Sequence, residues 1–218
     1  MNNNEQLGSF GLGWTFFGDI RLVKDSQGNV SIFNSGIKSL LPNQLSGTAI
    51  YQPGSQILPS EELLNNPYNL SNESLLGSSA SSRLFNLQTD GSYQVGEKDK
   101  GILTQVGNIY QLKEQDGTTI VFRTDGQLDY VQDTNGYRIT ATYANNKLTK
   151  LSASDGEFFN LIYNSQGRIS NVTDNTGQAT NYTYDTNGQS LLSVQDSKGK
   201  TSFTYGSPYD PSLVTSVT

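Results

Sequence analysis

Carboxylates and aromatic rings are the side chains of this sequence that could carry chemistry, because histidine and cysteine are both absent. Histidine is the commonest general base and metal ligand, and cysteine is needed for thiolate nucleophiles, thiolate metal sites and disulfides. There is no Gly-x-Ser-x-Gly and no phosphate-binding loop, and Gly11-x-Gly13 leads to Trp14 instead of the third glycine of a dinucleotide site. We therefore expect a protein that is not an enzyme and holds no cofactor.

Turn formation explains the carboxylates better than catalysis does. Several of the 20 acidic residues stand where an Asp side chain bonds its own backbone, namely Asp133, Asp155, Asp174, Asp185 and Asp196. Residues 133–136 and 185–188 both read Asp-Thr-Asn-Gly, which resembles the start of a calcium loop, but neither continues to the bidentate Glu of an EF-hand. We favour turns over weak calcium binding at both places and assign no metal ligand.

The regularly placed aromatic residues have two interpretations. Tyr182 and Tyr184, like Phe203 and Tyr205, are two residues apart and therefore share one face of a strand. Such rings could form core and ladder contacts between repeats, or an exposed platform on which sugar rings stack. Core contacts are the favoured interpretation, and a glycan partner bound by these four residues is the alternative.

Composition narrows the classes of partner. Hydrophobic residues make up only 33% of the chain, but 12 Tyr and 9 Phe argue against disorder. The net charge of −6 offers no basic stripe for phosphates, so we expect no nucleic-acid partner. No apolar run approaches the ~18 residues of a spanning helix, and Met1 to Phe10 lack the basic and apolar parts of an export signal. We expect no membrane span, and export only within a longer chain or through a dedicated apparatus.

The elements that must position these residues are β-hairpins of a repeat. From Asp125 onward the chain falls into units of about twenty residues. They close on Tyr143, Tyr163, Tyr184 and Tyr205, and Phe122 stands 21 residues before the first of these. Each unit has an early turn and a later turn, where Gly or Asn supplies positive φ. Gly167 and Gly188 belong to early turns, and Gly136, Gly156, Gly177 and Gly199 to later ones.

Short segments rich in β-branched and aromatic residues lie between these turns and are expected to be strands. One hairpin of this size is marginal in water, so successive hairpins must pair into a continuous twisted sheet. Ile169 and Val172 are three residues apart, which strict alternation would place on opposite faces. Either a β-bulge or contact on both faces would explain this spacing.

The last two units resemble the YD or RHS repeat, most closely from Tyr184-Asp185 through Gly188 to Asp196 and Gly199. The opening Gly8-Ser9-Phe10-Gly11-Leu12-Gly13-Trp14 is similar to the segment that often introduces such arrays. The resemblance covers roughly residues 8–35 and 86–205 and is looser where Ala144 and Asn164 replace the Asp after the aromatic residue.

The resemblance implies a spiral β-sheet wound into a hollow shell, as in bacterial polymorphic toxins, the cocoon components of insecticidal toxin complexes and teneurins. In the toxins the shell encloses a C-terminal effector. A chain of 218 residues would supply only an arc of such a wall. The family's Asp-Pro-x-Gly autocleavage segment has its nearest match at Asp210-Pro211-Ser212-Leu213, which lacks the glycine, so we expect no cleavage.

We expect an all-β fold of tandem hairpins in a twisted, spiralling antiparallel sheet. A lead-in segment with the first hairpin covers residues 1–35, an irregular Ser- and Pro-rich insertion covers 36–84, and YD-type hairpins cover 85–218. Residues 60–64 could form one short helix, capped by Ser60 and stopped before Pro67. The residues expected to define the repeat are Trp14, Phe122, Gly136, Tyr143, Gly156, Tyr163, Gly167, Gly177, Tyr184, Asp185, Gly188, Gly199 and Tyr205.

Two functions follow as hypotheses. The first is a non-catalytic segment of a shell that encloses or presents a toxin or other cargo, with flanking repeats or a shell partner beside it and an encapsulated effector inside. The second is a carbohydrate-binding or adhesive cell-surface module that uses exposed tyrosines. The resemblance implies a secreted or cell-surface location for either. Because a sheet arc exposes strand edges, we also expect the isolated chain to associate unless its edges are covered.

Overall fold

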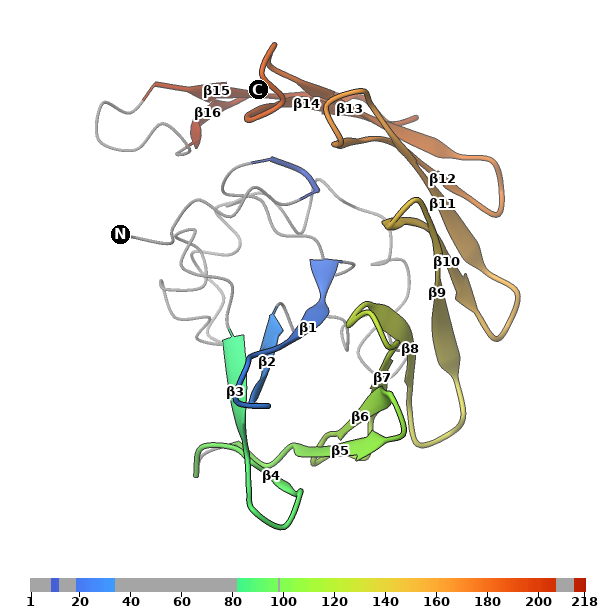
Figure 1. The fold of residues 1–218 in the computed structure, drawn as a ribbon. Coiled ribbons are helices and arrows are strands. Elements are labelled where there is room, and N and C mark those ends of the chain that lie inside the picture. Colours follow the sequence, from blue (N-terminus) through green and yellow to red (C-terminus); the bar gives the residue numbers. More distant parts are fainter. Residues whose placement is uncertain (1–8, 12–18, 34–81, 98, 207–213) are drawn as a thin grey trace, which may run out of the picture. The chain divides into compact units, whose positions relative to one another are not determined.

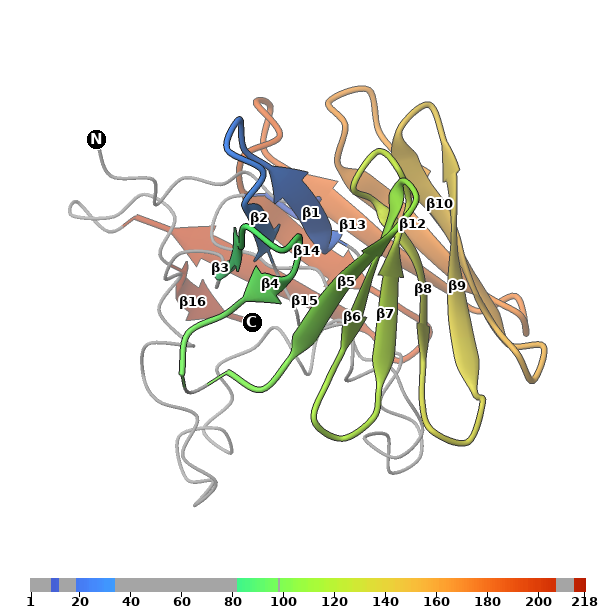
Figure 2. The ribbon, with the colours of Figure 1, turned by 60° about the horizontal axis from the view of Figure 1, so that its bottom comes forward.

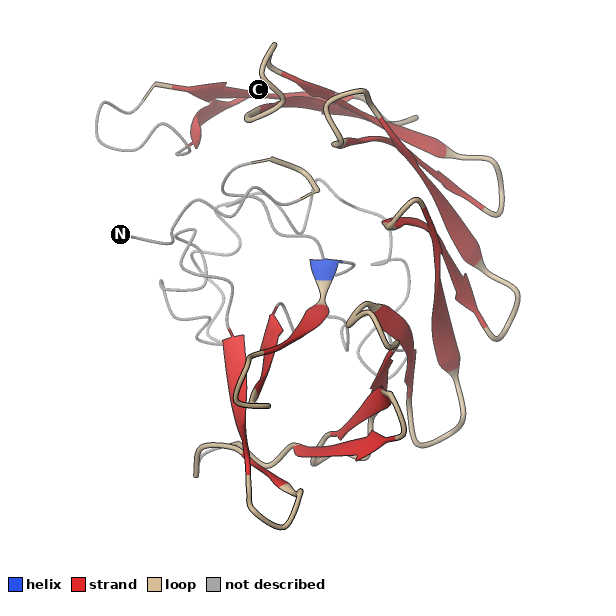
Figure 3. Ribbon diagram, viewed as in Figure 1, coloured by secondary structure: helices blue, strands red, loops and turns tan. Residues whose placement is uncertain are grey.

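Strands make up nearly all of the regular structure (Figure 3). The computed structural model describes residues 9–11, 19–33, 82–97, 99–206 and 214–218. No α-helix occurs among these residues, and only Asp19 has 3₁₀ geometry. The predicted all-β fold of antiparallel hairpins is therefore confirmed. The helix expected at residues 60–64 lies outside the described residues.

Sixteen strands are described, and they form two sheets in which each strand pairs with its neighbour in the sequence (Figure 1). The four-stranded sheet contains β1 (Arg21–Lys24), β2 (Val30–Phe33), β3 (Ser82–Leu87) and β4 (Tyr93–Gln94). The twelve-stranded sheet contains β5 (Ile102–Val106), β6 (Ile109–Lys113), β7 (Thr119–Phe122), β8 (Leu128–Gln132), β9 (Arg138–Ala144), β10 (Lys147–Ala153), β11 (Phe158–Tyr163), β12 (Ile169–Asp174), β13 (Ala179–Tyr184), β14 (Leu191–Gln195), β15 (Lys200–Tyr205) and β16 (Val214–Val217). Strand β3 begins at Ser82, inside the segment expected to be an irregular insertion.

The chain divides into two compact units. One comprises residues 17–46 and 81–159 and contains β1 to β10. The other comprises residues 1–16, 47–80 and 160–218 and contains β12 to β16. In the sequence, the division falls within β11, between Phe159 and Asn160.

In the unit of β1 to β10, the strands of successive hairpins from β5 to β10 lie side by side (Figure 2). Most of the buried residues of these strands lie on one face of the sheet, and Val121 is buried on the other. Leu112, Ile120, Phe122, Leu128 and Val131 come from the three adjacent strands β6, β7 and β8, and all are 0% exposed. Burial of an aliphatic or aromatic side chain of this size contributes about 1.5–3 kcal/mol to folding. The four-stranded sheet has its own buried residues, Val30, Ile32 and Phe85. Aromatic and branched residues two positions apart thus build the core that a single hairpin lacks.

The unit of β12 to β16 has the same two-faced construction. Ile169, Leu191 and Phe203 are buried on one face. The other face is polar, and its side chains bond across strands: the Asn171 amide donates to Asn181 at 2.9 Å, and the Thr183 and Ser193 hydroxyls lie 2.7 Å apart. One apolar and one polar face is the pattern expected for an antiparallel sheet with a single buried side.

A β-bulge begins the first strand of successive hairpins, which explains the spacing of three between buried residues. Register shifts follow the pairs Phe122↔Leu128, Tyr143↔Leu148, Tyr184↔Leu191 and Tyr205↔Val214. In each case the aromatic residue that closes one unit pairs with the residue just before the bulge in the next strand. The extra residue then restores the buried face, so that both Leu128 and Val131 are buried.

Ile169 and Val172 follow the same rule, because both are buried. The hydroxyl of Ser170 donates to the carbonyl oxygen of Ile162 at 3.2 Å. The extra residue Thr149 makes the equivalent bond to Thr142, also at 3.2 Å. This favours a bulge over contact on both faces.

Candidate functional site

Turns at the two ends of the hairpins hold most of the residues that the sequence singled out. We call residues 123–127, 145–146, 164–168 and 185–190 the early turns, and residues 114–118, 133–137, 153–157, 174–178 and 196–199 the late turns. Most share a frame in which the N–H of the first residue donates to the carbonyl of the fifth, and the glycine N–H donates to the carbonyl of the first. In one such turn, the Asp174 N–H donates to the Gln178 carbonyl at 3.0 Å, and the Gly177 N–H donates to the Asp174 carbonyl at 3.1 Å. Positive φ is found at Gly136, Gly156, Gly167, Gly177, Gly188 and Gly199, and at Asn145 and Asn146.

Asp side chains cap these turns from within. Oδ1 of Asp133 accepts the N–H groups of Asn135 and Tyr137 at 2.8 and 2.9 Å. Oδ1 of Asp185 accepts those of Gln189 and Ser190 at 2.7 and 3.1 Å. The carboxylates therefore satisfy backbone donors that the sheet leaves unpaired. Within the described part of the chain, no group of three acidic, His or Cys side chains could hold a metal ion.

In three hairpins, the tyrosine at the end of the second strand bonds to the backbone at the start of the first strand, and we call this bond a tyrosine lock. The hydroxyl of Tyr184 donates to the Ile169 carbonyl at 2.6 Å, and that of Tyr205 donates to the Leu191 carbonyl at 2.7 Å. Tyr143 hydrogen-bonds to the backbone of Leu128. Each bond runs from the end of the second strand to the bulged start of the first. Burial raises the pKa of Tyr143 to about 12, so its hydroxyl stays protonated at neutral pH.

The pattern of turns, bulges and tyrosine locks includes a segment that matches a known family model. Residues 163–201, which include both turns of one unit and the Tyr184 lock, match the family model described as RHS Repeat. This segment is an RHS repeat. No curated protein matches the chain. No helix in the described ranges is long and apolar enough to cross a membrane.

Side chains link one early turn to the next within each unit. The Gln127 amide donates to the Asn146 carbonyl at 3.1 Å. In the other unit, the Gln166 amide donates to the Thr186 carbonyl at 2.6 Å, and Nε of Arg168 donates to the Gly188 carbonyl at 2.6 Å. Each donor lies 19 or 20 residues before its acceptor, which is one repeat. The early turns are therefore hydrogen-bonded in pairs, one pair in each unit, and we call these pairs the linked early-turn edge.

Glycine is required in the early turns by close packing as well as by φ. Gly126 and Gly188 are buried. A Cβ on Gly126 would overlap the Leu22 carbonyl oxygen, and one on Gly188 would lie 2.9 Å from Cβ of Gln166. In the late turns, Gly136, Gly156, Gly177 and Gly199 are exposed, with no atom within 4 Å of the Cβ position. The two ends of the hairpins are thus packed very differently.

The lead-in also docks at the early turns. In one unit, Leu22 N–H donates to the Gly126 carbonyl at 2.8 Å. In the other, Ser9 accepts the Ile169 N–H at 3.0 Å, and the ring of the buried Phe10 lies 4.7 Å from that of Tyr182. A Cβ on Gly11 would overlap the Gln189 carbonyl oxygen. This explains the glycine of the opening motif, whereas Trp14 lies outside the described residues.

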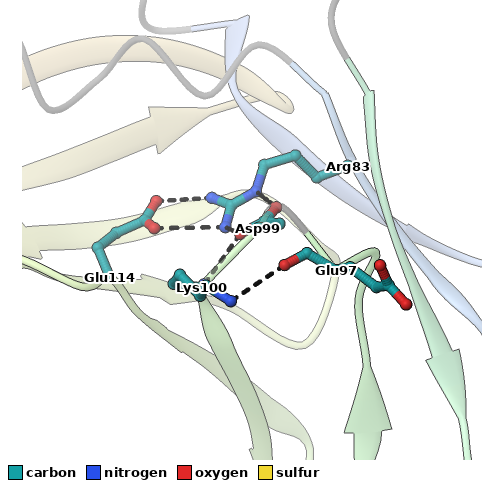
Figure 4. A network of polar contacts seen from close by, with 6 residues as sticks. Arg83, Glu97, Asp99, Lys100 and Glu114 are labelled. Atoms are coloured by element: carbon teal, nitrogen blue, oxygen red, sulfur yellow. Dashed lines mark hydrogen bonds and ion pairs between the residues drawn. The ribbon is translucent and has the colours of Figure 1, made fainter.

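An ion-pair network ties β3 to the first repeats (Figure 4). The Arg83 guanidinium donates through Nε and Nη2 to Asp99 at 2.6 Å, and through Nη1 and Nη2 to Glu114 at 2.6 and 3.3 Å. These side chains are 16%, 25% and 11% exposed, so solvent screens the pairs only partly. The hydrogen bond from Arg83 holds the pKa of Asp99 below its usual value.

The alternative of a sugar-stacking platform needs correction. Tyr182 is only 4% exposed and Phe203 only 3%, so neither ring is available to a ligand. Tyr184 and Tyr205 are half-buried, and their hydroxyls bond to backbone carbonyls. The aromatic residues occupy the core and the locks instead. The Asp-Pro stretch at 210–213 lies outside the described residues.

Sequence reasoning missed the linking side chains and the ion-pair network. A signal for some of them was present: a long polar residue directly follows the Gly or Asn of every early turn, at Gln127, Lys147, Arg168 and Gln189, and Gln127 and Arg168 make links. No comparable signal predicted the ion pairs of Arg83, because its partners lie 16 and 31 residues away, which does not match the repeat period.

Proposed function

We propose that these RHS repeats form part of the wall of a shell that encloses or presents a toxin or other cargo. The observation that carries the proposal is the linked early-turn edge. The aromatic residue that closes a unit pairs with the bulged start of the next strand. The early turns at 123–127 and 164–168 are each hydrogen-bonded to the early turn one repeat later. Such units can be added without limit, which is what a wall requires.

The wall acts through structure and not through chemistry. Asp133 and Asp185 cap turns, Asp99 and Glu114 bind Arg83, and Tyr184 and Tyr205 form locks. The partners are flanking repeats of a longer chain or a shell partner, with the cargo as an enclosed polypeptide. The protein works outside the producing cell or at its surface, as the RHS-repeat family suggests.

Protease protection tests this proposal on the natural protein purified from the producing cells. A wall that encloses cargo should keep a co-purifying polypeptide, or a segment of the same chain, resistant to protease until denaturant is added. Gly126→Ala, which disturbs the linked edge, should make that polypeptide digestible, whereas Gly136→Ala at an open late turn should leave it protected. Equal digestion of every polypeptide in the native protein would overturn the proposal.

A further inference from the structure

Asn-Gly occurs only twice in this sequence, each time within an identical Asp-Thr-Asn-Gly tetrapeptide, at 133–136 and 185–188. Asn-Gly is the dipeptide most prone to spontaneous deamidation, because glycine leaves its own backbone nitrogen unhindered. The two sites share their local chemistry, including an Asp cap, but they belong to different turns. Any difference in their reactivity must therefore come from the surrounding fold.

The turn at 185–188 is held by side chains of the preceding repeat, Gln166 and Arg168. The carbonyls on either side of Asn187, those of Thr186 and Gly188, each accept a 2.6 Å hydrogen bond from the preceding repeat. Gly188 is buried, and its N–H donates to the Asp185 carbonyl at 3.0 Å. The backbone rotation that brings the glycine nitrogen to the Asn side chain would break these bonds.

The turn at 133–136 has no such support. Asn135 and Gly136 are both exposed, and no atom lies within 4 Å of the Cβ position of Gly136. The Gly136 N–H makes a longer bond to the Asp133 carbonyl, at 3.3 Å. The hydrogen bonds to the backbone of residues 133–136 come from within the turn, chiefly from the Asp133 carboxylate, whereas the bond to the next late turn leaves from the Tyr137 hydroxyl, which contacts Asp155. Water and base can therefore reach the glycine nitrogen.

We propose that Asn135 is a self-modification site that deamidates in the folded protein, and that Asn187 is its protected counterpart. The Gly136 nitrogen loses its proton and attacks Cγ of Asn135. The N–Cγ bond forms, the Cγ–Nδ2 bond breaks, and Nδ2 leaves as ammonia after gaining a proton from solvent. Water then opens the cyclic succinimide at either carbonyl, which gives aspartate or isoaspartate.

The product would loosen one hairpin. Isoaspartate adds a methylene group to the backbone of a turn whose five-residue frame is closed by the 3.0 Å bond from Asp133 N–H to the Tyr137 carbonyl. Either product adds a carboxylate beside Asp133, which is itself only 8% exposed. Like charges in such proximity repel. Ageing of the protein therefore weakens the β8–β9 hairpin first.

Peptide mapping by mass spectrometry of protein aged at mildly alkaline pH tests this. Trypsin separates the two sites, since it cuts after Arg123 and Arg138 around one and after Arg168 and Lys198 around the other. In the folded protein, Asn135 should deamidate at least about tenfold faster than Asn187, the factor expected from two ordinary hydrogen bonds. In urea the two rates should converge.

A matched pair of variants isolates the cause. Gln166→Ala removes one support of the protected turn and should raise the Asn187 rate several-fold, whereas Gln178→Ala at a late turn should not change it. Equal rates at Asn135 and Asn187 in the folded wild-type protein, or a faster Asn187, would overturn the proposal. The wild-type ratio decides the matter even if a variant fails to fold.

Discussion

Early and late turns lie at opposite ends of the same strands and use similar turn chemistry, yet they contribute differently to the fold. At early turns, buried glycines pack against neighbouring backbone, and Gln and Arg side chains reach one repeat onward. At most late turns, the glycines are exposed, and an Asp carboxylate of the turn itself accepts its backbone N–H groups. Local turn sequence therefore specifies the conformation, whereas tertiary packing specifies how strongly it is held.

One late turn departs from this rule. In the turn at 114–118, Glu114 binds Arg83 instead of capping its own backbone, and Asp116 caps Thr118 in its place. A Cβ on Gly117 would lie 2.5 Å from Thr134. Early and late turns thus differ in packing because different side chains surround them. The late turn at 114–118 is packed because Arg83 and Thr134 lie beside it.

The largest expected effect is the difference between alanine at Gly126 and alanine at Gly136. Both positions have positive φ, which costs about 1–2 kcal/mol for a residue with a Cβ. Gly126→Ala also forces Cβ into the Leu22 carbonyl, which adds about 1–3 kcal/mol. Denaturant unfolding should show the Gly126 variant to be less stable by at least that second amount. Equal stabilities would mean that the packed edge carries no extra energy.

A smaller difference is expected between two tyrosine hydroxyls. Tyr184→Phe leaves the Ile169 carbonyl without its 2.6 Å partner and should cost about 1–3 kcal/mol. Tyr137→Phe removes a hydroxyl at a late turn that bonds to the exposed carboxylate of Asp155, and should cost less than about 1 kcal/mol because water replaces the partner. Urea unfolding of both variants measures the difference, and a larger loss at Tyr137 would contradict it.

The sequence predicts much of this fold because the same turn residues and the same strand residues recur in every repeat. The positive φ at Gly177 and the capping role of Asp185 follow from local turn chemistry. The bulge could not be chosen from Ile169 and Val172 alone, because register depends on the partner strand. The exposure of Tyr182 was also undetermined, since it depends on Phe10, which lies far away in the sequence.

Each hydrogen bond between early turns of successive repeats should contribute to the stability of the fold about as much as one ordinary hydrogen bond. Gln166→Ala removes the bond to the Thr186 carbonyl and should lower stability by about 0.5–1.5 kcal/mol. Gln178→Ala, whose side chain is exposed at a late turn, should change stability by less than about 0.5 kcal/mol. Hydrogen exchange should quicken at residues 185–190 only in the first variant. Unchanged exchange there would show that the early turns are independent of one another.

Acid tests whether the Arg83 network holds the packed late turn at 114–118. The Arg83 hydrogen bond lowers the pKa of Asp99 below its ordinary 3.8, so this pair stabilises the fold above that pH and is lost as pH falls through the lower folded-state value. Between neutral pH and about pH 4 nothing should change. Below that, the amide resonance of Gly101, whose N–H donates to Asp99 at 2.9 Å, should shift in NMR spectra at a lower pH in the wild-type protein than in Arg83→Met, in which Asp99 titrates near its ordinary pKa. The Gly117 amide should shift together with that of Gly101 in the wild-type protein, because both lie beside the Arg83 network. If the wild-type protein and the variant shift at the same pH, the Arg83 network does not hold this turn, and the departure from the rule disappears.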